Sequence, residues 1–227
     1  VLAFGFGRIF LATGSSWRRD GLGRQHRAPL LDTALRGVYT PDDIFAGATL
    51  PSPVVVYDDD HYYMGGALAE RLRKQGLEVH LVTPAVKVSE FTDMTMEQHR
   101  IQSGLLKMGV QVHTSSALTG ATQVAGGLAL ELASTYSDAR RVLECASLVM
   151  VTMRDPHDAV FTALQARQDQ WQDRGVKSVQ LLGDAYAPGS VAAAVYAGHR
   201  AARELDAPAP ALDAVPFRRE IIALSAD

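Results

Sequence analysis

The alternation of apolar and polar residues between positions 54 and 83 predicts a strand, a helix and a second strand. Four consecutive apolar or aromatic residues, Val54 to Tyr57, predict a buried strand. Residues 65–75 carry apolar side chains on one helical face, and Gly76 ends this segment. A second apolar run begins at Val79. This order is that of a βαβ unit, in which nucleotides commonly bind at the first turn.

The first turn of this unit departs from the glycine-rich pattern that brings the backbone close to a pyrophosphate. It reads Asp-Asp-Asp-His-Tyr-Tyr-Met over residues 58–64, and glycine appears only after it. Three carboxylates and two aromatic rings therefore stand where a diphosphate would lie. We interpret the turn as a degenerate nucleotide loop formed by Asp58, Asp59, Asp60, Tyr62, Tyr63, Gly65 and Gly66.

Two other interpretations of this turn stay open. The acids of residues 58–60 could lie in a solvated turn and cap the following helix. Clustered carboxylates could also bind a hard cation, but consecutive carboxylates point in different directions, which disfavours a metal site. The histidines show no HxxxH or HExxH spacing. We therefore predict no metal centre and no catalytic residue in this chain.

The remaining pattern predicts further elements on both sides of the unit. The Thr-Pro-Asp-Asp sequence at 40–43 is typical of a helix start, and Gly126-Gly127 predicts a hairpin turn. A helix is predicted over 93–108, with inward side chains from Met94, Ile101, Leu105 and Met108. The other predictions are strands near 8–12, 110–113, 119–124, 128–133, 142–144, 148–152 and 176–182, and helices at 156–174 and 188–204.

Composition narrows the classes of protein and of partner. Of 227 residues, 47% are hydrophobic and 21% are charged, which favours a buried core. The net charge is −3 and the basic residues are scattered, so neither nucleic acid nor a membrane surface is expected as a partner. No apolar run approaches the roughly 18 residues of a transmembrane helix. The single cysteine, Cys145, lies in an apolar stretch and predicts a buried, inert thiol.

The first residues, VLAFGFGRIFLATG, lack the basic segment of a signal peptide and resemble the middle of a domain. We therefore expect a cytoplasmic protein and interpret the chain as a fragment of a longer one. A single cysteine also excludes a cysteine-ligated iron–sulfur cluster built from this chain alone.

Two separated motifs predict strand ends that face a ligand. Ala12-Thr13-Gly14 and Gly183-Asp184 each end a predicted strand, and Gly189 follows near the start of a helix. The pair resembles the two late motifs of the FAD domain in flavoproteins such as glutathione reductase, where an NAD(P)H domain is inserted between them. This resemblance implies an α/β fold with a glutathione-reductase-like pair of three-layer nucleotide-binding domains and mostly parallel sheets.

The same resemblance implies domain boundaries and ligand contacts. Residues 1–50 and 153–227 would form an incomplete FAD- or ADP-binding-like domain, and residues 51–152 would form the inserted NAD(P)-binding-like domain. The cofactor-binding residues would be Ala12, Thr13, Gly14, Trp17, Arg18, Gly183, Asp184 and Gly189. The alternative for the strand ends is packing without a ligand. The alternative for Trp17 and Arg18 is an interface pair in which the guanidinium stacks on the indole.

A narrower resemblance covers residues 1 to about 206. The segments ATGSSWRRDGLGR, TPDDIFAG, VVVYDDDHYYMGG, EQHRIQ and GDAYAPGSVAAAVYAGHRAARELD look like the C-terminal part of trimethylamine and dimethylamine dehydrogenases, which are kin of histamine dehydrogenase and 2,4-dienoyl-CoA reductase. In that family an N-terminal barrel carries FMN and is followed by a 4Fe–4S cluster, and both are expected only in a part that this chain lacks. The resemblance implies ADP or FAD on the FAD-like domain. It also implies an electron-transferring flavoprotein and the barrel as partners, and a homodimer when intact.

These implications lead to a functional hypothesis and two alternatives. The chain is expected to be the nucleotide-binding and electron-transfer portion of a flavin-dependent amine dehydrogenase, inactive by itself because the catalytic barrel is absent. One alternative is the corresponding portion of an NAD(P)H-dependent enoate or 2,4-dienoyl-CoA reductase, and the acidic turn speaks against it. The other alternative is a non-catalytic scaffold domain.

Overall fold

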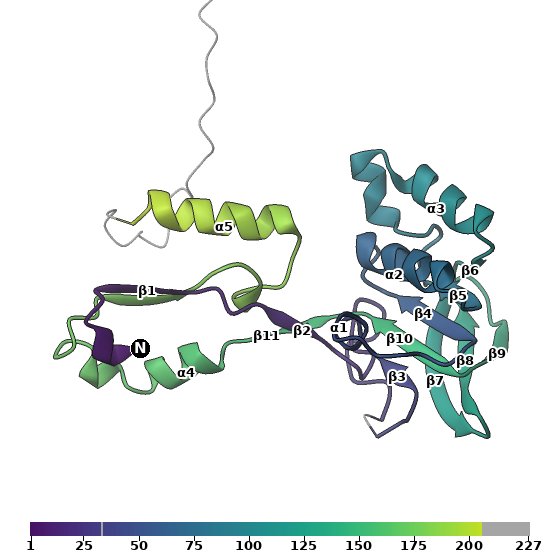
Figure 1. The fold of residues 1–227 in the computed structure, drawn as a ribbon, viewed down its shortest axis with the longest axis horizontal. Helices are drawn as coiled ribbons and strands as arrows, with labels where there is room; N and C mark the ends of the chain where they lie inside the picture. Colours follow the sequence, from purple (N-terminus) through teal and green to yellow (C-terminus); the bar gives the residue numbers. More distant parts are fainter. Residues whose placement is uncertain (33, 206–227) are drawn as a thin grey trace, which may run out of the picture. The chain divides into compact units, whose positions relative to one another are not determined.

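The computed structural model describes residues 1–32 and 34–205. Within them the chain forms two compact units (Figure 1). The first unit combines residues 1–15 with the segment that begins at residue 156, and the second comprises Ser16–Asp155. The second unit is thus inserted between two segments of the first. It begins well before residue 51, the boundary that the sequence predicted.

The inserted unit is built on a parallel sheet of five strands. In spatial order these are β3 (Val38–Tyr39), β10 (Ser147–Val151), β4 (Val54–Asp58), β5 (Val79–Val82) and β6 (Gln111–His113). Every neighbouring pair is parallel, so the carboxyl ends of all five strands meet at one edge. β4 and β10 are buried along their entire lengths, as expected for central strands of a covered parallel sheet.

Helices cover one face of this sheet. They are α1 (Pro41–Phe45), α2 (Tyr63–Lys74) and α3 (Gln98–Lys107). Leu68 and Leu72 of α2 share a buried cluster with Leu105 of α3 and with the valines of β4. The strand, helix and strand predicted over 54–83 are therefore confirmed, and so is the predicted helix start at 40–43.

A three-stranded antiparallel sheet covers the other face. It consists of β7 (Ser116–Val124), β8 (Gly127–Ser134) and β9 (Arg140–Cys145). Its leucines share a buried cluster with Tyr57 and Met150 of the parallel sheet. The predicted hairpin is confirmed, and Gly126 has the positive φ of 86° that favours glycine. The Cys145 thiol is buried as predicted, and burial raises its pKa to about 12.

The inserted unit thus has three layers: helices, a parallel sheet and an antiparallel sheet. This confirms the predicted α/β class with a mostly parallel central sheet. The more specific pairing of two glutathione-reductase-like domains stays a prediction.

Two predicted helices are shorter than the pattern indicated. Over 93–108 the chain instead forms a 3-10 helix, η2 (Glu90–Thr95), and then α3, because Met96 adopts a left-handed φ of 61° between them. Met94 was predicted to point inward, and that prediction is wrong, since it is 87% exposed. Over 156–174 the helix α4 (Ala159–Gln165) ends early and a 3-10 turn, η3 (Gln168–Gln170), follows.

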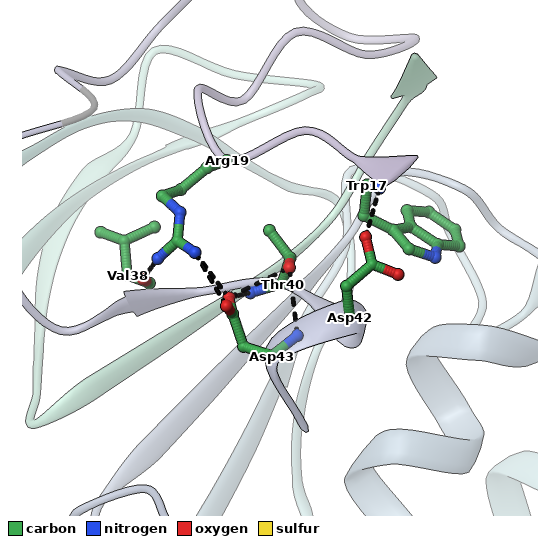
Figure 2. Close-up of polar contacts among 6 residues, drawn as sticks. All are labelled: Trp17, Arg19, Val38, Thr40, Asp42 and Asp43. Carbon is green, nitrogen blue, oxygen red and sulfur yellow. Dashed lines mark hydrogen bonds and ion pairs between the residues drawn. The ribbon is translucent and has the colours of Figure 1, made fainter. Parts of the chain in front are cut away.

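The segment 16–50 packs with the inserted unit because its polar side chains bind the edge of the sheet. Arg19 donates to the carbonyl oxygen of Val38 and, at 2.7 and 3.0 Å, to the carboxylate of Asp43 (Figure 2). Thr40 and Asp43 form a reciprocal cap at the start of α1, with the Thr40 backbone N–H donating to Asp43 Oδ2 at 2.7 Å. These bonds fix Arg19 beside the parallel sheet.

The first unit contains one parallel strand pair, β1 (Arg8–Leu11) with β12 (Ser178–Leu181). Ile9, Trp171 and Val179 belong to its buried cluster. Short 3-10 turns lie at η1 (Leu2–Phe4) and η4 (Gly183–Ala185), and α5 (Val191–Arg203) begins at the N-cap Ser190. β2 (Ser15–Trp17) pairs with β11 (Arg154–Pro156). None of the helices in the described ranges is long and apolar enough to cross a membrane.

Candidate functional site

The turn that follows β4 is closed by the carboxyl group of Asp58. This residue ends the strand and its side chain is completely buried. Asp58 Oδ1 accepts hydrogen bonds from the backbone N–H of Asp60 at 3.2 Å and of His61 at 3.1 Å. A Cβ placed on Gly65, in the first turn of α2, would lie 2.4 Å from Asp58 Cγ. The carboxyl group therefore occupies the space beside the start of α2, where a dinucleotide site holds its pyrophosphate.

This geometry changes the role expected of the glycines. Gly65 leaves room for the side chain of Asp58, and a phosphate would need the same space. Gly66 faces the Oγ of Ser89 and the side chain of Ile101, so it permits close packing of α2 against η2 and α3. Both glycines of the degenerate loop thus serve contacts within the chain.

The two tyrosines of the loop do not fill the phosphate position. Tyr63 Oη donates to Glu97 and lies 3.1 Å from Thr95 Oγ1, so this side chain is directed towards η2 and the start of α3. Its ring and that of Tyr62 are 4.3 Å apart, centroid to centroid. The sequence predicted that carboxylates and aromatic rings together stand in place of a diphosphate. In the structure the carboxyl group of Asp58 does so.

His61 links the turn to the neighbouring strand ends. It adopts a left-handed φ of 64°, which is uncommon for a residue other than glycine. Its Nε2 lies 3.4 Å from Asp59 Oδ1, and its Nδ1 lies 3.4 Å from Thr83 Oγ1, just after β5. The ring contacts Phe91 edge to face, with centroids 5.7 Å apart. The imidazole of His61 therefore connects the turn to Thr83 and Phe91.

A loop from the N-terminal part of the unit, residues 20–26, crosses the carboxyl ends of β4 and β10. The backbone N–H of Gln25 donates to Asp59 Oδ2 at 2.9 Å, and the backbone N–H of Met153 donates to Leu22 O at 3.2 Å. Gly23 is in such close contact that a Cβ there would lie 2.3 Å from Asp59 Oδ2. In doubly wound sheets, ligands bind beyond these carboxyl ends. Here the chain covers that place with its own backbone.

Trp17 and Arg18, predicted as nucleotide contacts or as a stacked pair, form contacts within the chain, and Arg18 alone binds this loop. Arg18 binds Asp20 at 3.0 Å and Asp155 at 2.7 Å. The backbone N–H of Trp17 donates to Asp42 at 2.8 Å (Figure 2), and its ring is covered by Arg154 at 5.0 Å. The prediction that Arg18 stacks on Trp17 is therefore wrong. Whether either residue also contacts a nucleotide stays a prediction.

Burial disfavours the ionised forms of the Asp58 and Asp60 carboxyl groups. It raises the pKa of Asp58 to about 7, although the hydrogen bond from the His61 N–H acts in the opposite direction. Burial also raises the pKa of Asp60 above its usual range. Asp58 Oδ2 has no hydrogen-bond partner among the described residues. A diphosphate would need hydrogen-bond donors at a site that is already short of them.

The pKa of Asp58 predicts how stability depends on pH. Since the folded-state pKa exceeds the unfolded value of about 3.9, the folded state binds more protons between about pH 4 and pH 7, and stability falls over this range by on the order of 2–4 kcal/mol. Asp58→Asn keeps the Oδ1 acceptor and should remove this decline. Urea unfolding at a series of pH values measures it, with the exposed Asp138→Asn as control. An unchanged pH slope in Asp58→Asn would contradict the assignment.

In the first unit, the two predicted strand-end motifs lie together. β1 and β12 are parallel and end in register at Leu11 and Leu181, so Thr13-Gly14 and Gly183-Asp184 follow at the same edge. Asp184 organises this edge: Ser15 Oγ donates to its Oδ2 at 3.1 Å, and the Gly189 N–H donates to its Oδ1 at 3.0 Å.

Backbone conformation at this edge suits close approach of a ligand. Gly14 has a φ of 79°, and a Cβ there would meet no atom within 4 Å. Gly183 has a φ of 57°. Thr13 is bonded to His157 through both its hydroxyl and its carbonyl oxygen, so its side chain is used within the chain. No group of three or more His, Cys, Asp or Glu side chains in the described part of the chain is arranged to hold a metal ion.

The sequence interpretation missed several residues that shape the site. Gly23, Gln25 and Thr83 hold the acidic turn from outside the βαβ unit. The Phe91 ring contacts the His61 ring edge to face. The guanidinium of Arg24 also lies over the Phe91 ring, 4.9 Å from its centroid. The paired glycines at 21 and 23 were the available signal, because close backbone packing commonly requires glycine.

Comparison with known proteins finds two amine dehydrogenases and an amine oxidase that are similar to this chain. Residues 39–147 match the model of the OYE-like second alpha/beta domain. Dimethylamine dehydrogenase of Hyphomicrobium sp. (strain x) is 27% identical over 240 residues, which cover 97% of this chain and 32% of that protein. The structure of histamine dehydrogenase from Rhizobium sp. 4-9 is 44% identical, with a TM-score of 0.87 over 98% of this chain and 34% of that one.

A third similar structure is that of 6-hydroxypseudooxynicotine amine oxidase from Pseudomonas geniculata N1. It is 30% identical, with a TM-score of 0.80 over 88% of this chain and 29% of that one. The chain spans about a third of the length of these relatives. The family match describes an OYE-like domain and does not support the prediction of a dinucleotide-binding half. The chain is homologous to dimethylamine and histamine dehydrogenases, and its residues 39–147 correspond to the OYE-like second alpha/beta domain.

Proposed function

We propose that the chain is the C-terminal portion of a flavin-dependent amine dehydrogenase of the trimethylamine dehydrogenase type. The observation that carries this proposal is the 44% identity to histamine dehydrogenase, with a TM-score of 0.87 over 98% of the chain. The similarity to dimethylamine dehydrogenase along 97% of the chain supports the same class of reaction. The substrate would be an amine, bound outside this chain.

In this proposal an N-terminal barrel outside this chain would hold FMN, which would supply the oxidation of the amine, and a 4Fe–4S cluster would follow the barrel. The described chain would hold ADP, or the ADP half of FAD, at the strand-end edge of the first unit. Its backbone at Gly14 and Gly183 would lie along the nucleotide, and Asp184 would keep the edge in shape through Ser15 and Gly189. Electrons would leave to an electron-transferring flavoprotein. The intact protein would be a cytoplasmic homodimer.

The inserted unit would contribute an occluded nicotinamide site. The carboxyl group of Asp58 and the loop 20–26 take the places of a pyrophosphate and of the ligand beyond the strand ends. An NAD(P)H-dependent enoate or dienoyl reductase needs this site to be open. The geometry therefore favours amine oxidation over that alternative.

Dye reduction by the longer protein that contains this chain tests the proposal. We expect reduction driven by a small secondary or tertiary amine, or by histamine, and none driven by NADPH. The 227-residue chain alone should give neither activity, because it lacks the barrel. NADPH-dependent reduction of an enoate or a dienoyl-CoA by the longer protein would overturn the proposal. Absence of both activities, with no adenine nucleotide retained after purification, would favour a scaffold domain.

A further inference from the structure

An open pocket of about 250 Å³ lies between the end of β6 and the antiparallel sheet of the inserted unit. It is far from the acidic turn in the sequence and uses different residues. The polar residues that line it are Thr114, Ser115, Ser116, Ser134, Arg140 and Arg141. This composition, with two cations and several hydroxyls but no carboxylate in the lining, is suited to an anion.

The fold fixes the relative positions of these groups. Ser116 at the start of β7 lies opposite Ser134 at the end of β8, and Ala133 of β8 lies opposite Arg140. Ser115 has a left-handed φ of 49°, and its carbonyl oxygen accepts from the Thr135 N–H at 3.0 Å. The hydroxyls and the arginines therefore come from strand ends tied by hydrogen bonds.

The two arginines carry charge that no carboxylate among residues 1–32 and 34–205 pairs with. In the described ranges neither guanidinium forms an ion pair, and Arg141 Nη2 reaches only Ser116 Oγ, at 3.5 Å. Glu131 lines an adjoining pocket together with both arginines, yet no ion pair forms. Ser116 is 9% exposed, so the hydroxyl that Arg141 meets is buried. The Ser116 hydroxyl donates to the Thr114 carbonyl oxygen at 2.9 Å, so the unpaired guanidinium of Arg141, and not this hydroxyl, is placed to donate to an added anion.

The histidine beside the pocket is not a competing cation. His113 Nε2 lies 3.1 Å from His80 Nδ1, and the two rings are stacked. Burial first, and then electrostatic interactions with Arg141 and His80, lower the pKa of His113 to about 4. His113 is therefore neutral at physiological pH. The positive charge at the pocket comes from the two arginines.

We propose that this pocket binds a small phosphate group, either free inorganic phosphate or the terminal phosphate of a monoester. The forked N–H groups of Arg140 and Arg141 match phosphate oxygens. Ser134 Oγ accepts from the Tyr136 N–H at 3.2 Å, which leaves its own hydroxyl proton available to donate. The pocket is smaller than the roughly 300 Å³ at which sites for larger organic ligands begin, so it suits a group of phosphate size. This site is independent of the proposed amine oxidation.

Calorimetric titration of the 227-residue chain with inorganic phosphate tests the inference. We expect saturable binding, weakened about tenfold or more in Arg141→Gln and in Arg140→Gln, because each loses charge-assisted hydrogen bonds. Arg100→Gln removes another exposed cation, from α3 of the same unit, and this variant should bind phosphate as the parent does. Arg141→Lys should fall between the parent and Arg141→Gln.

Two further measurements identify the source of the bound phosphate and provide a test if an arginine variant misfolds. If adenosine 5′-monophosphate binds more tightly than phosphate while adenosine does not bind, the ligand is a monoester, and equal affinities indicate free phosphate. Ser134→Ala keeps both arginines and should also weaken phosphate binding. This variant provides the test if an arginine variant loses its cooperative thermal transition. Absence of saturable binding to the parent chain would overturn the proposal, and so would equal weakening by Arg100→Gln.

Discussion

Replacing Gly65 with alanine is expected to destabilise the inserted unit by about 1–3 kcal/mol, the usual range for an overpacked buried site. The added Cβ would lie 2.4 Å from Asp58 Cγ and 2.6 Å from Asp58 Oδ2, and the Asp58 side chain is buried and cannot move into solvent. Urea unfolding of the two chains measures the difference. Gly104→Ala on α3 is the matched control, because a Cβ there would meet no atom within 4 Å.

The Gly65 effect should disappear when Asp58 is removed. In an Asp58→Gly background, Gly65→Ala should be neutral or stabilising by up to about 1 kcal/mol, because alanine favours a helix over glycine. The coupling between the two sites isolates the contact between the carboxyl group and the helix start. A full destabilisation by Gly65→Ala in the absence of Asp58 would show that other atoms, and not this carboxyl group, fill the space.

Replacing Gly14 with leucine is expected to expel the adenine nucleotide from the longer protein. Gly14 lies where the chain leaves β1, at the edge proposed for the nucleotide, and its surroundings are open within 4 Å. A leucine side chain would enter that space. Denaturation followed by chromatography of the released nucleotide measures occupancy, which should fall from near one equivalent to a small fraction.

The control for Gly14 must carry the same backbone strain. Gly175 has a φ of 72°, similar to the 79° of Gly14, and also has open surroundings, but it precedes β12 and lies at the other end of the strands. Gly175→Leu should therefore keep its nucleotide. Retention of the full complement by Gly14→Leu would mean that the nucleotide lies elsewhere.

Local signals in the sequence were sufficient for most of the inserted unit. The apolar run of β4, the hairpin glycines after β7 and the cap at Thr40 depend on neighbouring residues alone, and all were predicted. Met94 was misassigned because a 3.6-residue period continues through Met96, whose left-handed backbone breaks the helix. Periodicity contains no information about such a break.

The acidic turn shows what the sequence could not supply. Its departure from a phosphate-binding pattern was evident, but which of its groups replaces the phosphate depends on side-chain direction. Asp58 turns towards Gly65 while Tyr63 turns away to Glu97, although the two residues are only five positions apart. The cover provided by Gly23 and Gln25 is a contact across more than thirty residues, so local pattern could not reveal it.

We propose that Asp58 and the loop 20–26 occupy the place of a dinucleotide in the inserted unit. Calorimetric titration of the 227-residue chain with NADH at pH 7.5 tests it most directly, with triple replacement of Asp58, Asp59 and Asp60 by glycine or asparagine as the comparison. The closed geometry predicts no saturable heat for the parent chain up to about 1 mM NADH, which corresponds to binding weaker than about −4 kcal/mol. A submicromolar dissociation constant for NADH would contradict it.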